Sequence, residues 1–501
     1  MKRIIPLLIA VMLLCACAGR ADIQPLVRTD GHAEAYVREG ILHVRCEEGR
    51  YAAAVTVNGE RVWLCDGQYA IGACGAQTQV RVHTEAYPKV ISKQEADSIV
   101  LSLYDLDRNA YSVTWHTQLK NYPLLKLRRL GEETERMVTG YCDEGSGDYV
   151  NRAVIYGLEK NAEYAYTLCD AGGNESFAGS FTVGDPQTDT VTFMHISDTQ
   201  DTQLHGSVWA ELMRSAMQKQ GPPDMILHTG DIVQNGGVES DWKQMLGHVQ
   251  KYVSSIPFMA ASGNHSYWER YKNGYEDIEH KHITVKLPAQ NTNNGIYYSY
   301  DYGGVHFAVL SSGDLLSSGV GEKQLKWLEN DLAHAEKRWK IVLIHNPLYS
   351  CGRWGSNDSV NGVAKALRES VGSLLCRYGV DLVLQGHDHV FSLTLPITQQ
   401  GVPEPCAVRT VQEAGAEIYY YVQPSSPVYL VSGAGGSQNR AVEEAYDRAI
   451  FSQAQSVPAN TACYSLITVS KTRLTAAFYE YDYQNHEQRR IYCWGIDKGE
   501  Q

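Results

Sequence analysis

Five short polar motifs carry the side chains of this chain that could do chemistry. Each follows an apolar run and supplies oxygen or nitrogen atoms that bind metal ions: Asp198-Thr199-Gln200, Gly230-Asp231, Gly263-Asn264-His265, His345-Asn346-Pro347 and Gly386-His387-Asp388-His389. Carboxylates, amide oxygens and imidazoles are ordinary protein ligands of divalent cations. In open α/β sheets, ligands bind beyond the carboxyl ends of the strands. We therefore expect the five loops to converge on one sheet edge and to hold metal ions there.

These side chains divide into two ligand groups around a shared carboxylate. Asp231 has two oxygens and is the natural bridge between two ions. The other ligands would be Asp198 and His389 for one ion, and Asn264, His345 and His387 for the other. His387 and His389 are two residues apart, so in an extended segment they would project to the same side and reach adjacent ions. Two divalent cations about 3.5–4 Å apart generate hydroxide near neutral pH and clamp a phosphoryl group for in-line displacement.

The elements that must position these loops begin at Val191, where strands start to alternate with helices. Val208, Leu212 and Ala216 form a stripe with helical spacing after the first strand. Strands are expected at 191–196, 225–228, 258–261, 305–310, 340–344 and 380–384, and strands return at 428–431, 464–469 and 474–481. This alternation predicts an α/β layered domain.

Two β-rich stretches precede that domain. Residues 18–88 alternate apolar and polar positions, and Asn58-Gly59 is typical of a tight hairpin. They predict a small β domain that Cys46, Cys65 or Cys74 could staple. In residues 91–185, Trp115 and Tyr164 with their flanking residues resemble a fibronectin type III sandwich, in which a buried Trp and a corner Tyr fasten the two sheets.

The N-terminus is typical of an export signal. Lys2 and Arg3 precede an apolar stretch from Ile4 to Leu14, which is too short to span a bilayer. Residues 1–17 then end in a segment that resembles a bacterial lipoprotein processing box, with Cys17 as the lipid-bearing residue. Ordinary cleavage after an A-x-A pattern is the alternative. We expect an exported chain that is lipid-anchored to the bacterial cell envelope, or else secreted.

The charge balance argues against a nucleic-acid partner. The chain has 44 basic and 57 acidic residues, a formal net charge of −13, and no run of Lys and Arg that could follow a phosphate backbone. A small anionic substrate is still compatible with this charge, because bound cations invert the local field. No cysteine pair has C-x-x-C spacing, which argues against a zinc knuckle.

The ordered motifs D-x-(H/Q), G-D, G-N-H, H and G-H-x-H resemble those of the calcineurin-like metallophosphoesterase superfamily. Within it, the chain is most similar to purple acid phosphatases over roughly residues 91–481. The further segments that carry this likeness are 297–303 with 305–307, 324–328, 345–350 and 427–430. The fibronectin-like stretch ahead of the α/β domain also matches that family.

Three positions depart from the family pattern. Purple acid phosphatases carry a tyrosine three residues after the G-D aspartate, where this chain has Gln234. Other superfamily members carry histidine where this chain has Gln200, and the residue after G-N-H, often acidic, is Ser266. The first ion would therefore have an oxygen-rich ligand set, which favours Mn²⁺, Fe²⁺ or Mg²⁺ over Zn²⁺. We expect a protein that is not purple.

The resemblance implies a four-layer α/β/β/α sandwich at residues 190–490, preceded by the fibronectin-like and small β domains. It implies a phosphoric ester hydrolase with two divalent ions (Mn, Fe, Zn or Mg), in which metal-activated hydroxide attacks a small phosphate ester and His265 protonates the leaving oxygen. Phosphomonoesters are the favoured substrates. The alternatives are a phosphodiesterase acting on cyclic nucleotides or phospholipid headgroups, and a surface binding protein with little activity.

Several side chains near the motifs have a second interpretation. Gln200 could bind an ion or simply contact backbone, and His265 could be an ordinary hydrogen-bonded histidine. His195 and His228 lie on strands, so we expect them in the core or behind the ligands. Residues 351–354 could contact substrate or form a plain loop, and 433–436 is expected to be a tight backbone turn, since no helix with Lys follows.

Overall fold

The computed structural model describes most of the chain from residue 26 onward. The described residues are 26–38, 41–46, 50–58, 60–62, 69–70, 77–86, 95–120, 122–145, 147–170, 172–201, 204, 206–267, 279–288, 296–311, 320–356, 362–413 and 415–500. The signal segment with Cys17, and also Gly59, Cys65 and Cys74, lie outside them. The lipid anchor and the disulfide staple therefore stay predictions.

The N-terminal stretch forms two small sheets. One contains, in order, β1 (Leu26–Thr29), β7 (Gln79–Ala86), β4 (Arg50–Val57) and β5 (Glu60–Val62), and the other β2 (Ala33–Arg38), β3 (Ile41–Cys46) and β6 (Tyr69–Ala70). The predicted hairpin joins β4 to β5, where Val57 pairs with Glu60 and Asn58 has a φ of 54°. Leu42, Val55 and Val80 are fully buried in a small core of their own.

The second stretch is a β-sandwich of two four-stranded antiparallel sheets. Their orders are β11 (Arg136–Thr139), β10 (Leu124–Arg129), β14 (Glu163–Cys169), β15 (Glu175–Thr182), and β12 (Tyr141–Glu144), β13 (Tyr149–Ile155), β9 (Ala110–Thr117), β8 (Asp97–Asp105). Trp115 is buried between the sheets, as predicted. The hydroxyl of Tyr164 accepts a hydrogen bond of 3.1 Å from the backbone N–H of Glu159, which is the bond of a tyrosine corner.

The third stretch contains the two largest sheets. The eight-stranded sheet has the order β18 (Phe258–Ala260), β17 (Met225–His228), β16 (Val191–Ile196), β28 (Thr461–Val469), β29 (Arg473–Asp482), β30 (Glu487–Asp497), β25 (Ala416–Val422), β24 (Ala407–Glu413). The seven-stranded sheet has the order β19 (Tyr298–Tyr302), β20 (Val305–Val309), β21 (Trp339–Leu343), β22 (Leu382–Gln385), β26 (Val428–Ser432), β23 (Phe391–Thr394), β27 (Phe451–Gln455). The expected strands are all present within a few residues of their predicted bounds.

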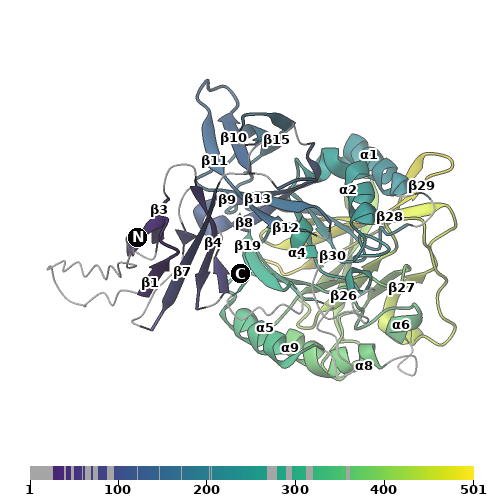
Figure 1. Cartoon of the computed structure of the whole chain (residues 1–501). Helices are drawn as coiled ribbons and strands as arrows, with labels where there is room; N and C mark the ends of the chain where they lie inside the picture. The colour runs from purple at the N-terminus through teal and green to yellow at the C-terminus, as the bar shows by residue number, and fades with distance from the viewer. Residues whose placement is uncertain are drawn as a thin grey trace, which may run out of the picture.

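Helices cover the outer faces of both sheets. Figure 1 shows α1 (Ser207–Gln220) and α2 (Glu239–Val253) on one side of the molecule, and α5 (Glu322–His334), α8 (Val363–Leu367) and α9 (Ser373–Arg377) on the opposite side. The predicted stripe Val208, Leu212 and Ala216 is buried on α1. The α8–α9 segment is one continuous helix with a π-helical turn, η4 (Arg368–Gly372), in its middle. The four-layer α/β/β/α prediction is confirmed.

The β-sandwich packs directly against the α/β domain. Residues of β8 and β9 share one continuous hydrophobic core with β16, β17 and α2. Buried hydrogen bonds cross the interface: the Ser102 hydroxyl donates to the Phe258 carbonyl (3.0 Å), and the Tyr166 hydroxyl donates to the Ser254 carbonyl (2.9 Å). The sandwich therefore supports β18 and α2, which flank two of the predicted ligand loops.

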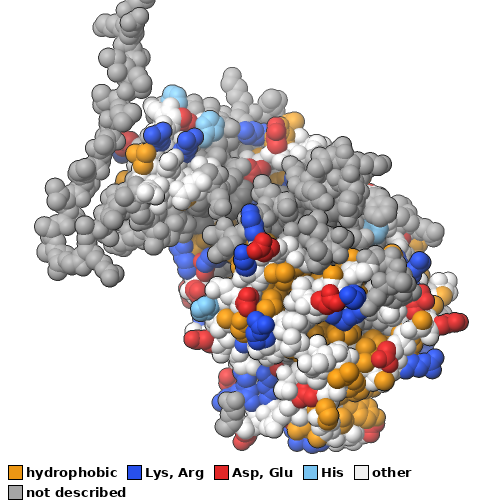
Figure 2. All heavy atoms as spheres, turned by 90° about the horizontal axis from the view of Figure 1, so that it is seen from below, with side chains coloured by type: hydrophobic (Ala, Val, Ile, Leu, Met, Phe, Trp, Pro, Cys, Tyr) orange, Lys and Arg blue, Asp and Glu red, His pale blue; other side chains and the backbone are white. Residues whose placement is uncertain are grey.

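The distribution of charged side chains on the surface agrees with the absence of a Lys and Arg run in the sequence. Figure 2 shows Lys and Arg side chains in small groups among Asp and Glu on the described part of one face. Within the described part of the chain, no helix combines the length and apolar character needed to cross a membrane. Several cysteines, Cys351 and Cys463 among them, are buried free thiols, as expected for core residues.

Candidate metal centre

The predicted ligand loops meet where strands of the two large sheets end. β16, β17 and β18 run parallel in neighbouring positions of the eight-stranded sheet, and β21 and β22 run parallel in the other. Asp198, Asp231 and Asn264 follow the first three strands, while His345 and His387 follow the last two. The chain is hydrogen-bonded across these ends, for example from the Asp198 N–H to the Gly230 carbonyl at 3.0 Å. The structure therefore brings all five loops together.

Left-handed backbone recurs at the predicted ligands. Asp198, Asp231, His387 and His389 have φ values of 53°, 56°, 72° and 50°. Such conformations cost about 1–3 kcal/mol for non-glycine residues and collect at functional sites. The expectation that His387 and His389 lie on an extended segment is wrong. The chain turns sharply there, with the Asp388 N–H bonded to the Gly386 carbonyl at 2.9 Å, because only this turn aims the two imidazoles at different partners.

Glycines let the backbone approach the carboxylates closely. A Cβ on Gly263 would lie 2.1 Å from Asp231 Oδ1, and one on Gly386 would lie 2.1 Å from Ser197 Oγ. Both glycines precede predicted ligands, Asn264 and His387. A larger residue at either position would push its ligand loop away from the carboxylate.

Four ligand atoms converge around His345. Its Nδ1–H donates to the Thr229 carbonyl (2.8 Å), so Nε2 is directed to the site. Nε2 lies 3.0 Å from Asp231 Oδ2, 3.1 Å from Asn264 Oδ1 and 3.2 Å from His387 Nδ1. Metal bonds of about 2.0–2.2 Å place neighbouring ligands about 3 Å apart, so these four atoms fit one cation.

A second group forms around His389. Its Nδ1–H donates to the Gln438 carbonyl, which leaves Nε2 at 3.3 Å from Asp198 Oδ1. Both Asp198 oxygens accept the His387 backbone N–H, at 3.0 and 2.9 Å. Gln200 Nε2 is 3.5 Å from His389 Nε2, and among the described residues the buried Gln200 Oε1 has no hydrogen-bond partner. An amide oxygen without a donor is available to a cation, so the donor set fits a second ion.

The electrostatics of the two groups favour bound cations. Burial alone would raise the pKa of Asp198, but the neighbouring His389 and His345 imidazoles hold it well below its usual range. Burial alone would lower the pKa of His345, and the Asp231 carboxylate raises it to about 9. Burial, followed by the charge of His345, lowers the pKa of His387 to about 3, so this ring is a neutral donor. A divalent cation would replace the proton that Asp231 holds on His345, because a histidine binds a metal only in its neutral form.

His265 lies beside Asp231 and is oriented by Gln234, which the sequence marked only as a departure from the family pattern. Its Nδ1–H donates to the Gln234 carbonyl (2.7 Å), and its backbone N–H donates to Asp231 Oδ1 (2.8 Å). Nε2 then lies 3.9 Å from Asp231 Oδ2. The Gln234 side chain also faces the ring and accepts a bond of 3.0 Å from Gln438 Nε2. Gln234 therefore orients the ring of His265.

His195 and His228 lie behind the ligands. His195 contacts the hydroxyls of Ser432 (2.9 Å) and Thr229 (3.0 Å) with its two ring nitrogens. His228 Nδ1 accepts the Gly230 N–H (3.1 Å), and the other ring nitrogen contacts a threonine hydroxyl. Burial lowers both pKa values to about 3, so both rings are neutral. They support the loops and have no nitrogen left for an ion.

Two further segments border the site. Residues 433–436 form the expected tight turn, and the Gly435 N–H donates to the Ser197 carbonyl at 2.7 Å. This turn leads to Gln438, which no motif had marked. On the other side, the half-buried Trp354 ring lies 5.3 Å from the His387 ring, and the exposed Arg353 guanidinium lies 5.5 Å from Trp354. Of residues 351–354, Trp354 therefore lies against a predicted ligand and Arg353 lies next to it, while Cys351 is buried.

Replacing Gln200 and Gln234 separately distinguishes a ligand from an orienting residue. We expect Gln200→Ala to weaken binding of one of two Mn²⁺ ions about tenfold or more, because it removes the unpartnered amide oxygen. Gln234→Ala should leave both affinities within about twofold, since its side chain faces His265. Calorimetric titration of the metal-depleted chain measures both. Equal losses in the two variants would contradict this assignment.

The chain is similar in sequence to a known family and to several known proteins. The family of calcineurin-like phosphoesterases matches residues 191–391. Human acid phosphatase type 7 is 26% identical over 239 residues, 44% of this chain and 50% of that protein. Probable inactive purple acid phosphatase 1 of Arabidopsis thaliana is 28% identical over 43% of this chain and 35% of its own length. The chain thus spans half or less of these relatives.

The fold comparison reaches further along the chain. A purple acid phosphatase from yellow lupin (Lupinus luteus) seeds aligns with 85% of this chain and 78% of its own, at a TM-score of 0.63 and 17% identity. That alignment is too long to be confined to the α/β domain. Residues 191–391 therefore match the calcineurin-like phosphoesterase family, and most of the chain has a fold similar to that of a purple acid phosphatase.

Proposed function

We propose that this chain hydrolyses phosphate esters at a centre of two divalent cations. The observation that carries the proposal is that potential metal-ligand atoms gather in two groups, one around His345 Nε2 and one around His389 Nε2. One ion would be held by Asp198, Gln200, Asp231 and His389, and the other by Asp231, Asn264, His345 and His387. When bound, the ions would supply positive charge that polarises a phosphoryl group and acidifies water.

His265 supplies the proton that the leaving oxygen needs. Donation from Nδ1 to the Gln234 carbonyl fixes the ring, so Nε2 is the nitrogen that can release a proton toward the site. Nε2 lies 3.9 Å from Asp231 Oδ2, so this nitrogen is on the side of the ring that faces the proposed ions. An alkoxide leaving group gains most from this proton, because it is a strong base.

The ligand chemistry supports a colourless enzyme with oxygen-preferring ions. The position that carries tyrosine in purple acid phosphatases is Gln234, and its side chain is engaged by Gln438 and His265. No phenolate is therefore available there. A set of carboxylate and amide oxygens with one imidazole around the first ion favours Mn²⁺, Fe²⁺ or Mg²⁺ over Zn²⁺.

The monoester reaction is the more favoured of the two ester classes. Support for this choice comes from the similarity to proteins named acid phosphatases, human acid phosphatase type 7 among them. The second candidate function is that of a surface binding protein with little activity, because one similar protein is named a probable inactive purple acid phosphatase. The retention of all predicted ligands within bonding reach of one another favours catalysis, because a surface binding protein has no chemical need for them.

Metal-dependent turnover tests the proposal. After chelation and addition of Mn²⁺, Fe²⁺, Mg²⁺ or Zn²⁺, we expect hydrolysis of an aryl phosphate monoester, with a smaller rate on the matching diester. Asp231→Asn should reduce kcat by at least about 10³, because it removes the shared ligand. His306→Gln, a buried histidine away from the site, is the control. No turnover and no bound metal with any ion would contradict the proposal, and faster diester hydrolysis would favour the phosphodiesterase.

A comparison of two substrates with different leaving groups tests the role of His265. We expect His265→Ala to lower kcat about 10²–10⁴-fold on an alkyl phosphate, whose leaving group needs a proton. The loss on p-nitrophenyl phosphate should be much smaller, since nitrophenolate leaves without one. Equal losses on both substrates would show that His265 positions the substrate and does not act as the acid.

A further inference from the structure

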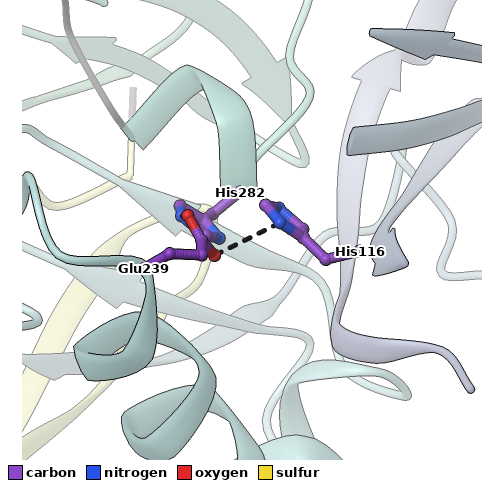
Figure 3. Close-up of side chains that lie close together, drawn as sticks. All are labelled: His116, Glu239 and His282. Carbon is purple, nitrogen blue, oxygen red and sulfur yellow. Dashed lines mark ion pairs between the residues drawn. The ribbon is translucent and has the colours of Figure 1, made fainter. Parts of the chain in front are cut away.

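A second cluster of metal-binding side chains lies at the interface between the β-sandwich and the α/β domain. His116 is on β9, and Asp148 lies just before β13, both in the sandwich. Glu239 begins α2, and His282 ends α4 (Glu279–His282) of the α/β domain. Figure 3 shows His116, Glu239 and His282 facing one another across the interface. None of these residues belongs to a motif used by the proposed reaction.

His116 presents one ring nitrogen to the cluster. Its Nε2 faces the Lys281 carbonyl at 3.0 Å, and because a carbonyl only accepts, Nε2 carries the proton. Nδ1 lies 2.6 Å from Asp148 Oδ2 and 3.2 Å from Glu239 Oε1. A backbone carbonyl that fixes the tautomer from behind is the usual support of a metal-ligating histidine.

His282 faces the same point without a hydrogen bond. Its side chain is fully buried, and neither ring nitrogen has a hydrogen-bond partner among the described residues. Nε2 lies 3.5 Å from Glu239 Oε2, and neither Glu239 oxygen has a hydrogen-bond partner in the same part of the chain. The ring is clamped between His116 (4.4 Å, nearly parallel) and Trp242 (4.1 Å). A buried polar group without a partner costs about 1–3 kcal/mol, so several of them together call for a ligand.

The charges lead to the same conclusion. Two carboxylates, Asp148 and Glu239, face two imidazoles inside the interface. A single proton on His116 leaves one buried negative charge uncompensated, whereas one divalent cation with neutral imidazoles balances both carboxylates. The ligand atoms of His116, Glu239 and His282 all lie within 4.8 Å of one another. Contacts of 3.2 and 3.5 Å match the edges of a tetrahedron around an ion with bonds of about 2.0–2.1 Å.

We propose that His116, Glu239 and His282 bind one Zn²⁺ ion that joins the β-sandwich to the α/β domain, with the Asp148 carboxylate beside His116. Two imidazoles and one carboxylate, with a second carboxylate balancing the charge, suit zinc, and burial in the interface suits a structural site. The ion would tie the sandwich to α2 and α4, which follow the loops of Asp231 and His265 in the chain. It would thereby hold these loops in place without touching a substrate.

Zinc stoichiometry of the full chain tests this site independently of phosphatase activity. The chain is loaded with Zn²⁺, passed over a chelating resin and measured by mass spectrometry. Asp231→Asn/His345→Gln disables the metal centre and should retain one Zn²⁺ per chain. His282→Gln should bind one Zn²⁺ fewer than the wild type. His306→Gln is the matched control, because His306 is also buried between two carboxylates, Asp301 and Asp331, each at 2.8 Å, and should bind the wild-type number.

Two outcomes would overturn the proposal. One is wild-type zinc content in His282→Gln, and the other is no zinc in Asp231→Asn/His345→Gln that remains folded by circular dichroism. If His282→Gln does not fold, anomalous scattering from the zinc-loaded wild type decides, since a peak is expected beside His116 Nδ1, His282 Nε2 and the Glu239 carboxylate. Absence of that peak would show that protons alone neutralise the cluster. Failure of the phosphatase proposal would change turnover but not this zinc.

Discussion

Two buried carboxylates, Asp198 and Asp231, set the constraint on which the rest of the site depends. They are 0% and 1% exposed at the ends of neighbouring parallel strands. Burial of like charges is costly unless opposite charge lies within a few ångströms. His345 Nε2 lies 3.0 Å from Asp231, and His389 Nε2 lies 3.3 Å from Asp198. The other nitrogen of each ring donates to a backbone carbonyl. Divalent cations between these groups would satisfy this constraint and would supply the positive charge that the proposed reaction needs.

The scaffold keeps this arrangement rigid from two directions. Left-handed backbone conformations orient the ligands. Gly263 and Gly386 allow the backbone to approach Asp231 and Ser197 closely. The β-sandwich shares its core with β16, β17 and α2, so the loops at their ends are anchored on a large body. The proposed zinc site lies in this same interface. The fold can tolerate the strained backbone of the ligand loops because the packing around these loops determines their positions.

The residue patterns were sufficient to predict an α/β layered domain, most strands and the residues that meet in the centre, and the family resemblance supplied the four-layer arrangement. Strand ends could be located because apolar runs stop at polar motifs, and parallel strands bring their ends to one edge. The turn at residues 387–389 could not be predicted, since strand alternation was the only local guide. Gln438 and the interface cluster could not be predicted from the sequence either. In both cases the residues that meet in space come from loops and sheets that are distant in sequence. His282, which lacks a motif, could be taken only as structural.

The most direct test of the central claim is the anomalous scattering of a manganese-loaded crystal. The account predicts two Mn peaks about 3.5–4 Å apart, one on each side of the Asp231 carboxylate. One should lie near His389 Nε2, and the other near His345 Nε2 and His387 Nδ1. A single peak, or two peaks that do not share Asp231, would contradict the account.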